Sequence, residues 1–460
     1  MNKRVIAVIA LSVVATATLF ADVTYHEPDQ QYEKNMHRYG TGIKNWERAE
    51  FMRFTMADSY LFHYYAKVTA DKNNKMSLKV SNTLDITKMM FDDIVPNEKI
   101  SLYNIMRDRA SVQSYVVMNA AGEIVAEDYW SNTNQKTKHH LMSANKSFSS
   151  MVAYIVADKG FFKLSDKAGK WVEELRGTPW ADITLQEYSD MTSGIGTLLS
   201  SANGWGMPGG STWDSCMSTA GGYNGLIKRD GKLLPPIDDK GDLRTLSDYV
   251  SKFAHNVKPT YKAGTTYEYR GLNTEILALA AERATGLNLS ELMDKYLWSK
   301  GGFNSFMTMY VNQKHESLAA GSMNCTNRDF AIGSWIMGHG GKNWKGEQVI
   351  PEHFIEQIKN GDQKVKDAWA KVSYEHLLAP NAFYKNQWRT ITDDRTGRTI
   401  SVMVGVNGQL SAFDHKTGNV VALFGAYRTP TGQAMVNLYL FDIIFPILNK
   451  MDEGKSKKII

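Results

Sequence analysis

The chain of 460 residues carries 53 Lys and Arg against 48 Asp and Glu, and a formal net charge of +5 is too small to indicate nucleic-acid binding. This length is enough for a large hydrophobic core, in one large domain or two closely packed ones. No group of Cys and His residues has the spacing of metal ligands, so we expect neither a metal site nor another cofactor.

The first 21 residues have the pattern of a secretory signal peptide. Lys3 and Arg4 precede an apolar stretch over 5–14, and small residues over 17–21 suit cleavage after Ala21. An uncleaved anchor is the alternative, but the stretch is short for a transmembrane span and no later segment is long and apolar enough. We therefore expect a periplasmic or secreted protein without a membrane span in its mature chain, which begins with a polar arm over 22–45.

The next patterns are a pair of strands and a helix. Two strands are predicted within 111–130, on either side of an Ala-Ala-Gly-Glu turn. A helix with apolar residues at helical spacing follows from Ser143 and ends near Gly160. Helical patterns then alternate with Gly-rich loops, which predicts a mainly helical insert over about 165–380.

A long Gly-rich loop is predicted over 200–224. It carries Trp205, Trp213 and Tyr223, and such large aromatic side chains are usually buried or bind a ligand. Long loops in compact domains often contribute to function. We expect these three residues to bind substrate in a pocket that the loop shapes.

Strand patterns return over 399–406, 410–413 and 420–424, and an apolar helix over 435–448 follows them. Strands at both ends with helices between them predict an α+β fold: one antiparallel sheet built from N- and C-terminal strands, flanked by helices, with the helical insert as a subdomain. The domain is expected to span 46–450, and a charged tail to follow over 451–460.

Ser143 and Lys146 form a Ser-x-x-Lys motif at the start of the predicted helix. Residues three apart lie on one helix face, so the lysine can reach the serine hydroxyl. A serine hydroxyl becomes a good nucleophile when a base takes its proton, and a buried lysine can be that base. The backbone N–H of a serine at a helix N-terminus is also free to bind an oxyanion.

The two cysteines are candidates for a disulfide, and the adjacent histidines are candidates for metal ligands. A disulfide between Cys216 and Cys325 is compatible with export, and two buried free thiols are equally compatible with the sequence. The adjacent His139 and His140 would point to opposite faces of a strand rather than converge on a metal.

Several ordered motifs resemble the serine β-lactamase and penicillin-binding-protein superfamily, especially its class C-like branch with esterases and 6-aminohexanoate-dimer hydrolase. They are Ser143-x-x-Lys146, Ile183-Thr184-Leu185, Met191-Thr192-Ser193-Gly194-Ile195, Tyr269 before Asn273-Thr274, and matching stretches at 177–182, 326–330, 344–346 and 350–351. The resemblance runs from about 111 to 424. It implies a β-lactamase/transpeptidase-like fold and hydrolysis through an acyl-enzyme.

The resemblance also implies roles for individual residues. Ser143 would attack a carbonyl and become acylated, and Lys146 would hold or accept its proton. Tyr269 would pass that proton to the leaving group and later help to activate the deacylating water. Residues 405–409 resemble the Gly-x-His-Gly-Gln segment of esterases and amidases, so the backbone N–H of Gln409 would join that of Ser143 as an oxyanion donor.

Some positions depart from the pattern of true β-lactamases. Asn407, which we expect to contact the substrate, stands where many relatives carry histidine, and no lysine on that strand can pair with a β-lactam carboxylate. Gly271 replaces the asparagine of Tyr-x-Asn. Lys416-Thr417-Gly418 spells a β-lactamase motif but lies where a turn between two strands is predicted.

Three functions are compatible with these residues. The favoured one is an exported serine hydrolase that cleaves a small-molecule ester or amide, as a carboxylesterase or a 6-aminohexanoate-dimer hydrolase does. The second is a β-lactamase or a D-alanyl cell-wall peptidase. The third is a non-catalytic protein that binds peptidoglycan or a partner.

Overall fold

The computed structural model describes residues 23–196, 213–229, 231–235, 244–371, 376–377, 379–428 and 434–456. The predicted signal peptide and Trp205 lie outside these ranges. Among the helices within them, none combines the length and the apolar character that crossing a membrane requires.

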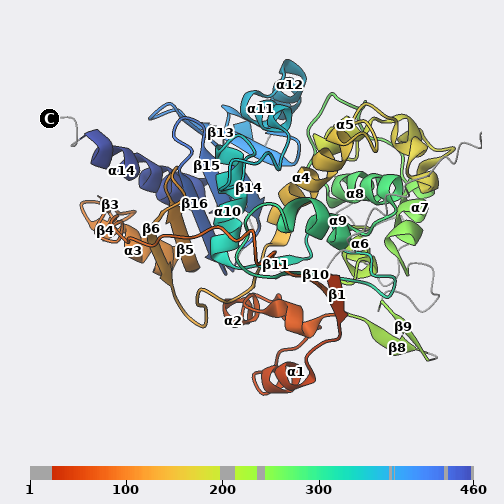
Figure 1. Ribbon diagram of the computed structural model, residues 1–460, viewed down its shortest axis with the longest axis horizontal. Coiled ribbons are helices and arrows are strands. Elements are labelled where there is room, and N and C mark those ends of the chain that lie inside the picture. Colours follow the sequence, from red (N-terminus) through yellow and green to blue (C-terminus); the bar gives the residue numbers. More distant parts are fainter. Residues whose placement is uncertain are drawn as a thin grey trace, which may run out of the picture.

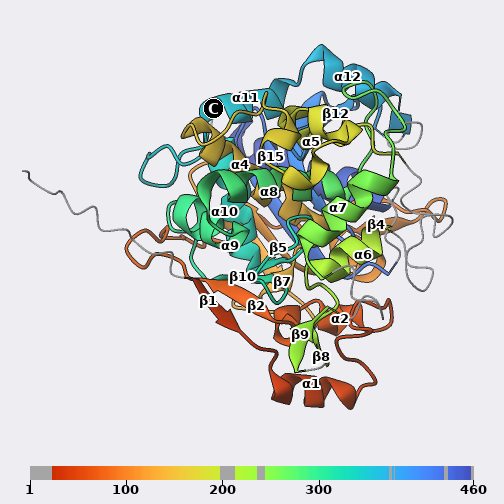
Figure 2. The same cartoon turned by 90° about the vertical axis from the view of Figure 1, so that its right-hand side faces the viewer.

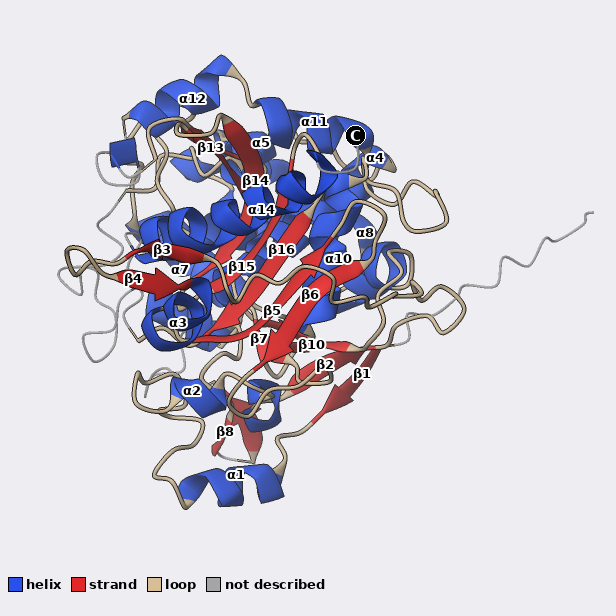
Figure 3. Ribbon diagram, turned by 90° about the vertical axis from the view of Figure 1, so that its left-hand side faces the viewer, coloured by secondary structure: helices blue, strands red, loops and turns tan. Residues whose placement is uncertain are grey.

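A seven-stranded antiparallel sheet joins strands from both ends of the chain (Figure 3). In spatial order its strands are β12 (Ala382–Lys385), β13 (Trp388–Asp393), β14 (Arg398–Gly405), β15 (Gln409–Asp414), β16 (Val420–Gly425), β5 (Val112–Met118) and β6 (Ile124–Tyr129). The two ends meet where β16 pairs with β5. The predicted α+β fold, with one antiparallel sheet made of N- and C-terminal strands, is therefore confirmed.

Helices cover this sheet, and most of them lie in the chain between its N-terminal strands β5 and β6 and its C-terminal strands β12 to β16. The α-helices are α1 (Gln30–His37), α2 (Met52–Thr55), α3 (Leu102–Asn104), α4 (Asn145–Asp158), α5 (Leu185–Ser189), α6 (Trp213–Ala220), α7 (Leu246–Asn256), α8 (Gly271–Thr285), α9 (Leu289–Leu292), α10 (Asn327–Gly338), α11 (Glu352–Asn360), α12 (Gln363–Ala370) and α14 (Phe445–Ser456). Tighter or wider helical turns are η1 (Ser59–Phe62), η2 (Ile105–Arg109), η3 (Met142–Ala144), η4 (Ala168–Lys170), η5 (Glu173–Leu175), η6 (Pro179–Asp182), η9 (Met293–Trp298) and η10 (Ala434–Ile444).

Both faces of the sheet are covered by other elements, and each strand contributes to both because its alternate residues point to opposite faces. On β16, Val420, Ala422 and Phe424 belong to the core that includes residues of α4, α8 and α10. Val421 and Leu423 belong to a second core, together with residues of η10 and α14. Figure 1 shows the resulting layers, with α14 on one side of the sheet and α10 on the other, and α4 and α8 beyond α10.

A second sheet lies beside the helical region (Figure 2), in the order β1 (Val23–His26), β2 (Tyr65–Val68), β10 (Met307–Tyr310), β11 (Met323–Cys325) and β7 (His139–His140). Part of the predicted polar arm over 22–45 belongs to it, because β1 pairs with β2 along its whole length. Helix α1 follows, and its first turn is capped by Asp29, whose carboxylate accepts a 2.8 Å hydrogen bond from the Tyr32 N–H. Residues 23–37 are therefore folded rather than an extended arm.

Two short hairpins complete the described strands: β3 (Met90–Asp92) with β4 (Lys99–Ser101), and β8 (Ile227–Arg229) with β9 (Lys232–Leu234). The predicted helical insert thus contains strands as well as helices, since β8, β9, β10 and β11 fall within 165–380. Cys216 and Cys325 are both buried, and neither forms a disulfide.

Candidate active site

Ser143 lies in the helical turn η3, which runs directly into α4. Strands from both sheets hold this turn. The Leu141 N–H donates to the Met323 carbonyl of β11, and β14 passes so close that a Cβ on Gly405 would lie 2.2 Å from the Leu141 carbonyl oxygen. Met142 has a φ of +48°, a strained value for a non-glycine residue, so the surrounding contacts fix the backbone just before Ser143.

Lys146 and Ser143 are brought together as their spacing predicts. The Lys146 ammonium donates a 2.8 Å hydrogen bond to Ser143 Oγ and a 2.9 Å bond to the Ala320 carbonyl oxygen. Lys146 is only 4% exposed, whereas Ser143 is partly exposed. The lysine is therefore fixed below a serine hydroxyl that a ligand can reach.

Tyr269 lies two residues before the first residue of α8 and completes the group formed by Ser143 and Lys146. Its ring centre lies 5.0 Å from Lys146 Nζ and 4.8 Å from the Arg389 guanidinium carbon. Burial raises the pKa of Tyr269, but the charges of Lys146 and Arg389 and hydrogen bonds with Ser143 and Lys146 lower it more, so the pKa lies below that of an ordinary tyrosine. The hydroxyl is therefore easier to ionise than in water.

The ends of β14 and β15 lie beside the Ser143 turn, where Gly405 pairs with Gln409. The Gln409 side chain is buried and donates a 2.9 Å hydrogen bond to the Gly425 carbonyl of β16. This bond ties the strand ends together. The assignment of the Ser143 and Gln409 backbone N–H groups as oxyanion donors stays a prediction.

A cavity of about 260 Å³ opens over Ser143, Lys146 and Tyr269. Its other lining residues come from α6, the start of α8, the segment before β11 and the β14–β15 turn: Met142, Met217, Ser218, Tyr223, Arg270, Gly271, Leu318, Ala320, Gly321 and Val406. The predicted loop over 200–224 is thus partly helical, and its second half forms one wall of the cavity.

The four residues predicted to bind substrate do not all line the cavity. Tyr223 lines the cavity, and its hydroxyl donates a 2.9 Å hydrogen bond to Glu47. Asn407 is only 3% exposed and does not line the cavity, because its side chain donates to the Tyr427 carbonyl oxygen at 2.8 Å. Trp205 and the side chain of Trp213 lie outside the described residues.

The sequence motif Lys416-Thr417-Gly418 lies in the turn between β15 and β16, as predicted. Asp414 Oδ1 accepts hydrogen bonds from the backbone N–H groups of Lys416 and Thr417, at 2.7 and 2.9 Å. None of the three motif residues lines the cavity. Their role here is that of an ordinary hairpin turn.

Sequence reasoning missed Met217, Arg389 and Glu275 as residues of or near the site. Glu275 carried a detectable signal, since a charged residue stands directly before the apolar run over 276–281 of α8. Arg389 carried none, because only the fold brings β13 beside Tyr269.

The two histidines of β7 have separate partners, as expected for neighbouring strand residues. The His139 ring nitrogen Nε2 lies 2.9 Å from Gln113 Oε1, whereas His140 Nδ1 lies 3.1 Å from the Tyr310 hydroxyl. Within the described parts of the chain, no group of three or more His, Cys, Asp or Glu side chains is arranged to hold a metal ion.

Known proteins match both the sequence and the fold. A family model described as Beta-lactamase matches residues 104–341, just over half of the chain. A 6-aminohexanoate-dimer hydrolase of Paenarthrobacter ureafaciens is 25% identical over 326 residues, which cover 70% of this chain and 74% of that protein.

Two solved structures extend the likeness of the fold. A Bacillus anthracis protein assigned as a 6-aminohexanoate-dimer hydrolase superposes with a TM-score of 0.73 at 21% identity, over 93% of this chain and 99% of its own. EstCE1, a hydrolase with promiscuous acyltransferase activity, superposes with a TM-score of 0.55 at 11% identity, over 74% of this chain and 97% of its own. The chain belongs to the beta-lactamase family and is a serine hydrolase.

Proposed function

We propose that the protein cleaves a small ester or linear amide through an acyl-enzyme on Ser143. The observation that carries this proposal is the contact of Lys146 Nζ with Ser143 Oγ at 2.8 Å, beside a tyrosine whose pKa is lowered. A hydroxyl, a fixed cation and an ionisable phenol are together sufficient for nucleophilic and acid–base catalysis.

In the acylation step, Ser143 Oγ forms a bond to the substrate carbonyl carbon while its proton passes to the Tyr269 oxygen. The Lys146 ammonium stabilises both oxygens electrostatically. Backbone N–H groups of Ser143 and Gln409 would bind the negative oxygen of the tetrahedral intermediate. The bond to the leaving group then breaks, and the alcohol or amine departs with the proton from Tyr269.

Deacylation reverses these roles. Water attacks the acyl carbon and gives its proton to the Tyr269 oxygen. The bond between the acyl carbon and Ser143 Oγ breaks, the proton returns to Ser143, and the carboxylic acid is released. The same three side chains therefore serve both half-reactions.

The cavity lining favours an apolar group next to the scissile bond. Met142, Met217, Leu318 and Val406 supply much of the wall. The Arg270 guanidinium, which also lines it, is engaged by Glu268 at 2.6 Å and by two carbonyl oxygens. This arrangement supports an ester or amide with an apolar acyl part more than a β-lactam, whose carboxylate needs an available cation.

We further propose that residues 1–21 direct export and are removed. The pattern of Lys3, Arg4 and the apolar stretch after them supports this proposal. The N-terminal sequence of the protein recovered from the periplasm or medium should begin at Asp22. Recovery of a membrane-bound protein with an intact N-terminus would favour the uncleaved anchor.

The proposed activity is tested by the intact mass of the purified protein after reaction with a fluorophosphonate, and by turnover of p-nitrophenyl acetate, p-nitrophenyl butyrate and nitrocefin. We expect one phosphonate adduct, turnover of both esters and little nitrocefin hydrolysis. Ser143→Ala should abolish adduct and turnover, whereas Ser218→Ala, which changes another serine of the same cavity, should retain the adduct.

The same experiment separates the alternatives. Rapid nitrocefin turnover, or a stable adduct with penicillin, would assign the protein to the β-lactamases or cell-wall peptidases. The absence of any adduct with any probe would mean that the protein binds its ligand without cleaving it.

A further inference from the structure

Glu275 is a buried carboxylate close to the proposed active site. It lies on α8, six residues after Tyr269, and is 1% exposed. The residues of α8 from Leu272 to Ala281 are all buried, so this charge lies inside the protein. A buried carboxylate is tolerated only where hydrogen bonds compensate for the lost water.

Both oxygens of Glu275 bind the backbone of the segment that lines the cavity. Oε2 accepts from the Ala319 N–H at 3.0 Å, and Oε1 accepts from the Ala320 N–H at 2.7 Å. The Ala320 carbonyl oxygen in turn accepts the 2.9 Å hydrogen bond of Lys146 Nζ, which also donates to Ser143. Hydrogen bonds on both sides of Ala320, one to its N–H and one to its carbonyl, thus link Glu275 to Lys146 and through it to Ser143.

Helix α4 holds the same segment from the other side. The Asn145 side chain donates to the Leu318 carbonyl at 3.2 Å, and the Ser149 hydroxyl donates to the Ala319 carbonyl at 2.9 Å. These bonds occupy carbonyl oxygens, whereas Glu275 engages the N–H groups of Ala319 and Ala320. Only a group that accepts two hydrogen bonds can take the place of Glu275.

We propose that Glu275 is a positioning residue whose ionised carboxylate holds Ala319 and Ala320 where the Ala320 carbonyl fixes the Lys146 ammonium beside Ser143. This inference rests on the proposed function, since it assigns a purpose to the position of Lys146. Glu275 does not touch the substrate in this proposal, but it sets the position of Lys146, which does.

The position of Glu275 makes its charge sensitive to pH near neutrality. Burial raises the pKa of Glu275 to about 7, against the opposing effects of the Ala320 and Ala319 N–H groups and the Lys146 charge. Glu316 also raises this pKa, and Glu282 is a further acidic group on α8 that interacts with Glu275. Above about pH 7 the carboxylate accepts both hydrogen bonds; below it, a proton occupies one oxygen and one of the two bonds is lost.

The test is the rate of Ser143 phosphonylation between pH 5.5 and 9, which requires no natural substrate. The wild-type rate should fall as the pH decreases through about 7. Glu275→Gln places an amide NH2 against a backbone N–H, so its rate should be roughly ten- to hundredfold lower at high pH. Its rate should also lose the step near pH 7, while Glu275→Asp should keep the step and recover part of the rate.

Glu282→Gln is the matched control. Glu282 is on the same helix, has a pKa raised by burial to about 8, and accepts a hydrogen bond from the Leu289 N–H, in a part of α8 that does not line the cavity. We expect this variant to label at nearly the wild-type rate with the step near pH 7 retained. A similar loss of rate in both variants would show that a buried charge on α8 matters only for folding, and would overturn the inference.

The other possible results for Glu275→Gln and for the wild type also decide whether the inference holds. If Glu275→Gln labels at the wild-type rate with the wild-type pH profile, the inference is wrong while the proposed function stands. If Glu275→Gln does not fold, Glu275→Asp and the wild-type profile decide, and a wild-type rate that is flat between pH 6 and 8 overturns the inference. No adduct on wild-type Ser143 would refute the proposed function and this inference with it.

Discussion

The guanidinium carbon of Arg389 lies 4.8 Å from the centre of the Tyr269 ring, on the side of the fold formed by β13. Arg389 also lies 5.4 Å from the Tyr384 ring and donates to the Tyr267 hydroxyl at 3.4 Å. Three tyrosine side chains therefore surround this arginine, and its charge is one of the causes that lower the pKa of Tyr269.

Replacing Arg389 with glutamine should raise the pKa of Tyr269, because a nearby positive charge favours the phenolate. If the phenolate is the base that activates Ser143, activity is present above this pKa. The rising limb of kcat/KM for p-nitrophenyl acetate should then move to higher pH, and activity near neutrality should fall roughly three- to tenfold.

Arg395→Gln is the control for a lost positive charge, since Arg395 is mostly exposed and pairs with Asp393 at the end of β13. Its pH profile should match that of the wild type. An unchanged profile in Arg389→Gln would refute the assignment of Tyr269 as the base whose ionisation limits the rate.

Gly271 determines the space available beside the scissile bond. A Cβ at this position would lie 2.7 Å from Met217 Cε and 3.3 Å from Ala320 Cβ. Gly271→Ala should push the flexible Met217 side chain into the cavity and lower the turnover of p-nitrophenyl butyrate roughly tenfold relative to the acetate. Ser143 phosphonylation should be retained.

The double variant Gly271→Ala with Met217→Ala should restore the butyrate-to-acetate ratio, because the shorter side chain removes the contact. Ratios of kcat/KM measured for the two esters in all three proteins test this prediction. A ratio that does not respond to either substitution would mean that the acyl group binds elsewhere.

The sequence was sufficient for the central parts of the fold and the site. Strand patterns predicted β5, β6 and β14–β16 to within a few residues, because their apolar residues alternate or form an unbroken run between turn residues. The contact between Lys146 and Ser143 followed from helical spacing alone, and the position of Tyr269 beside them required the family resemblance.

Other features depend on contacts between distant segments. Strand β1 has four residues, too few for a recognisable pattern, and it forms only because β2 lies beside it. Asn407 occupies a turn with a φ of +66°, where its side chain bonds to Tyr427 instead of facing the cavity. Neither the pairing nor the direction of that side chain is encoded by local sequence.

Cys216 and Cys325 should both be reduced and should not be joined by a disulfide. Each side chain is buried without a disulfide, and burial raises the pKa of the Cys325 thiol. The folded protein should therefore react slowly with a thiol reagent such as dithionitrobenzoate, and two thiols should react in urea without prior reduction. If fewer than two thiols react in urea and two are recovered after reduction, the two cysteines form a disulfide.

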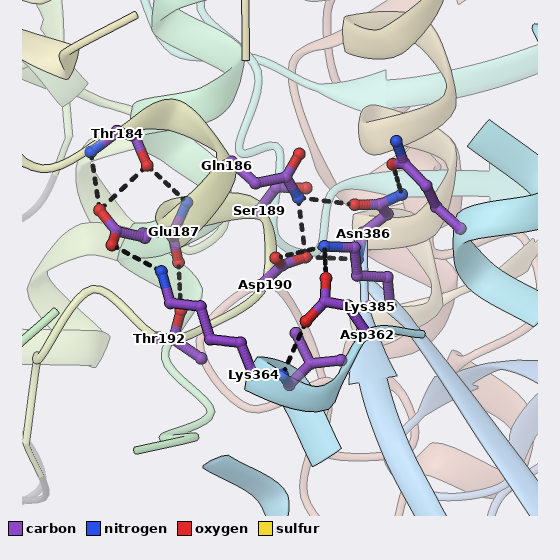
Figure 4. A network of polar contacts seen from close by, with 12 residues as sticks. Thr184, Gln186, Glu187, Ser189, Asp190, Thr192, Asp362, Lys364, Lys385 and Asn386 are labelled. Carbon is purple, nitrogen blue, oxygen red and sulfur yellow. Dashed lines mark hydrogen bonds and ion pairs between the residues drawn. The ribbon is translucent and has the colours of Figure 1, made fainter. Parts of the chain in front are cut away.

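Stability should depend on a buried ion pair that joins α5 to the β12–β13 hairpin (Figure 4). Lys385 Nζ lies 2.8 Å from Asp190 Oδ2 and 2.9 Å from Asp362 Oδ2, and the side chains of Lys385 and Asp190 are each 6% exposed. Asp190 also accepts the Asn386 N–H at 3.0 Å, which fixes the tip of the hairpin. This hairpin leads into β13 and thus positions Arg389.

Lys385→Met should lower the free energy of unfolding by about 3–5 kcal/mol, because it leaves the Asp190 carboxylate buried without its cation. Adding Asp190→Asn should recover part of this loss. Lys364→Met is the matched control: this lysine pairs with Glu187 at 3.0 Å in the same region, but its side chain is 56% exposed, so the cost should be below about 1 kcal/mol. Urea unfolding at pH 7 measures all four proteins, and equal losses for the two lysine variants would contradict the prediction.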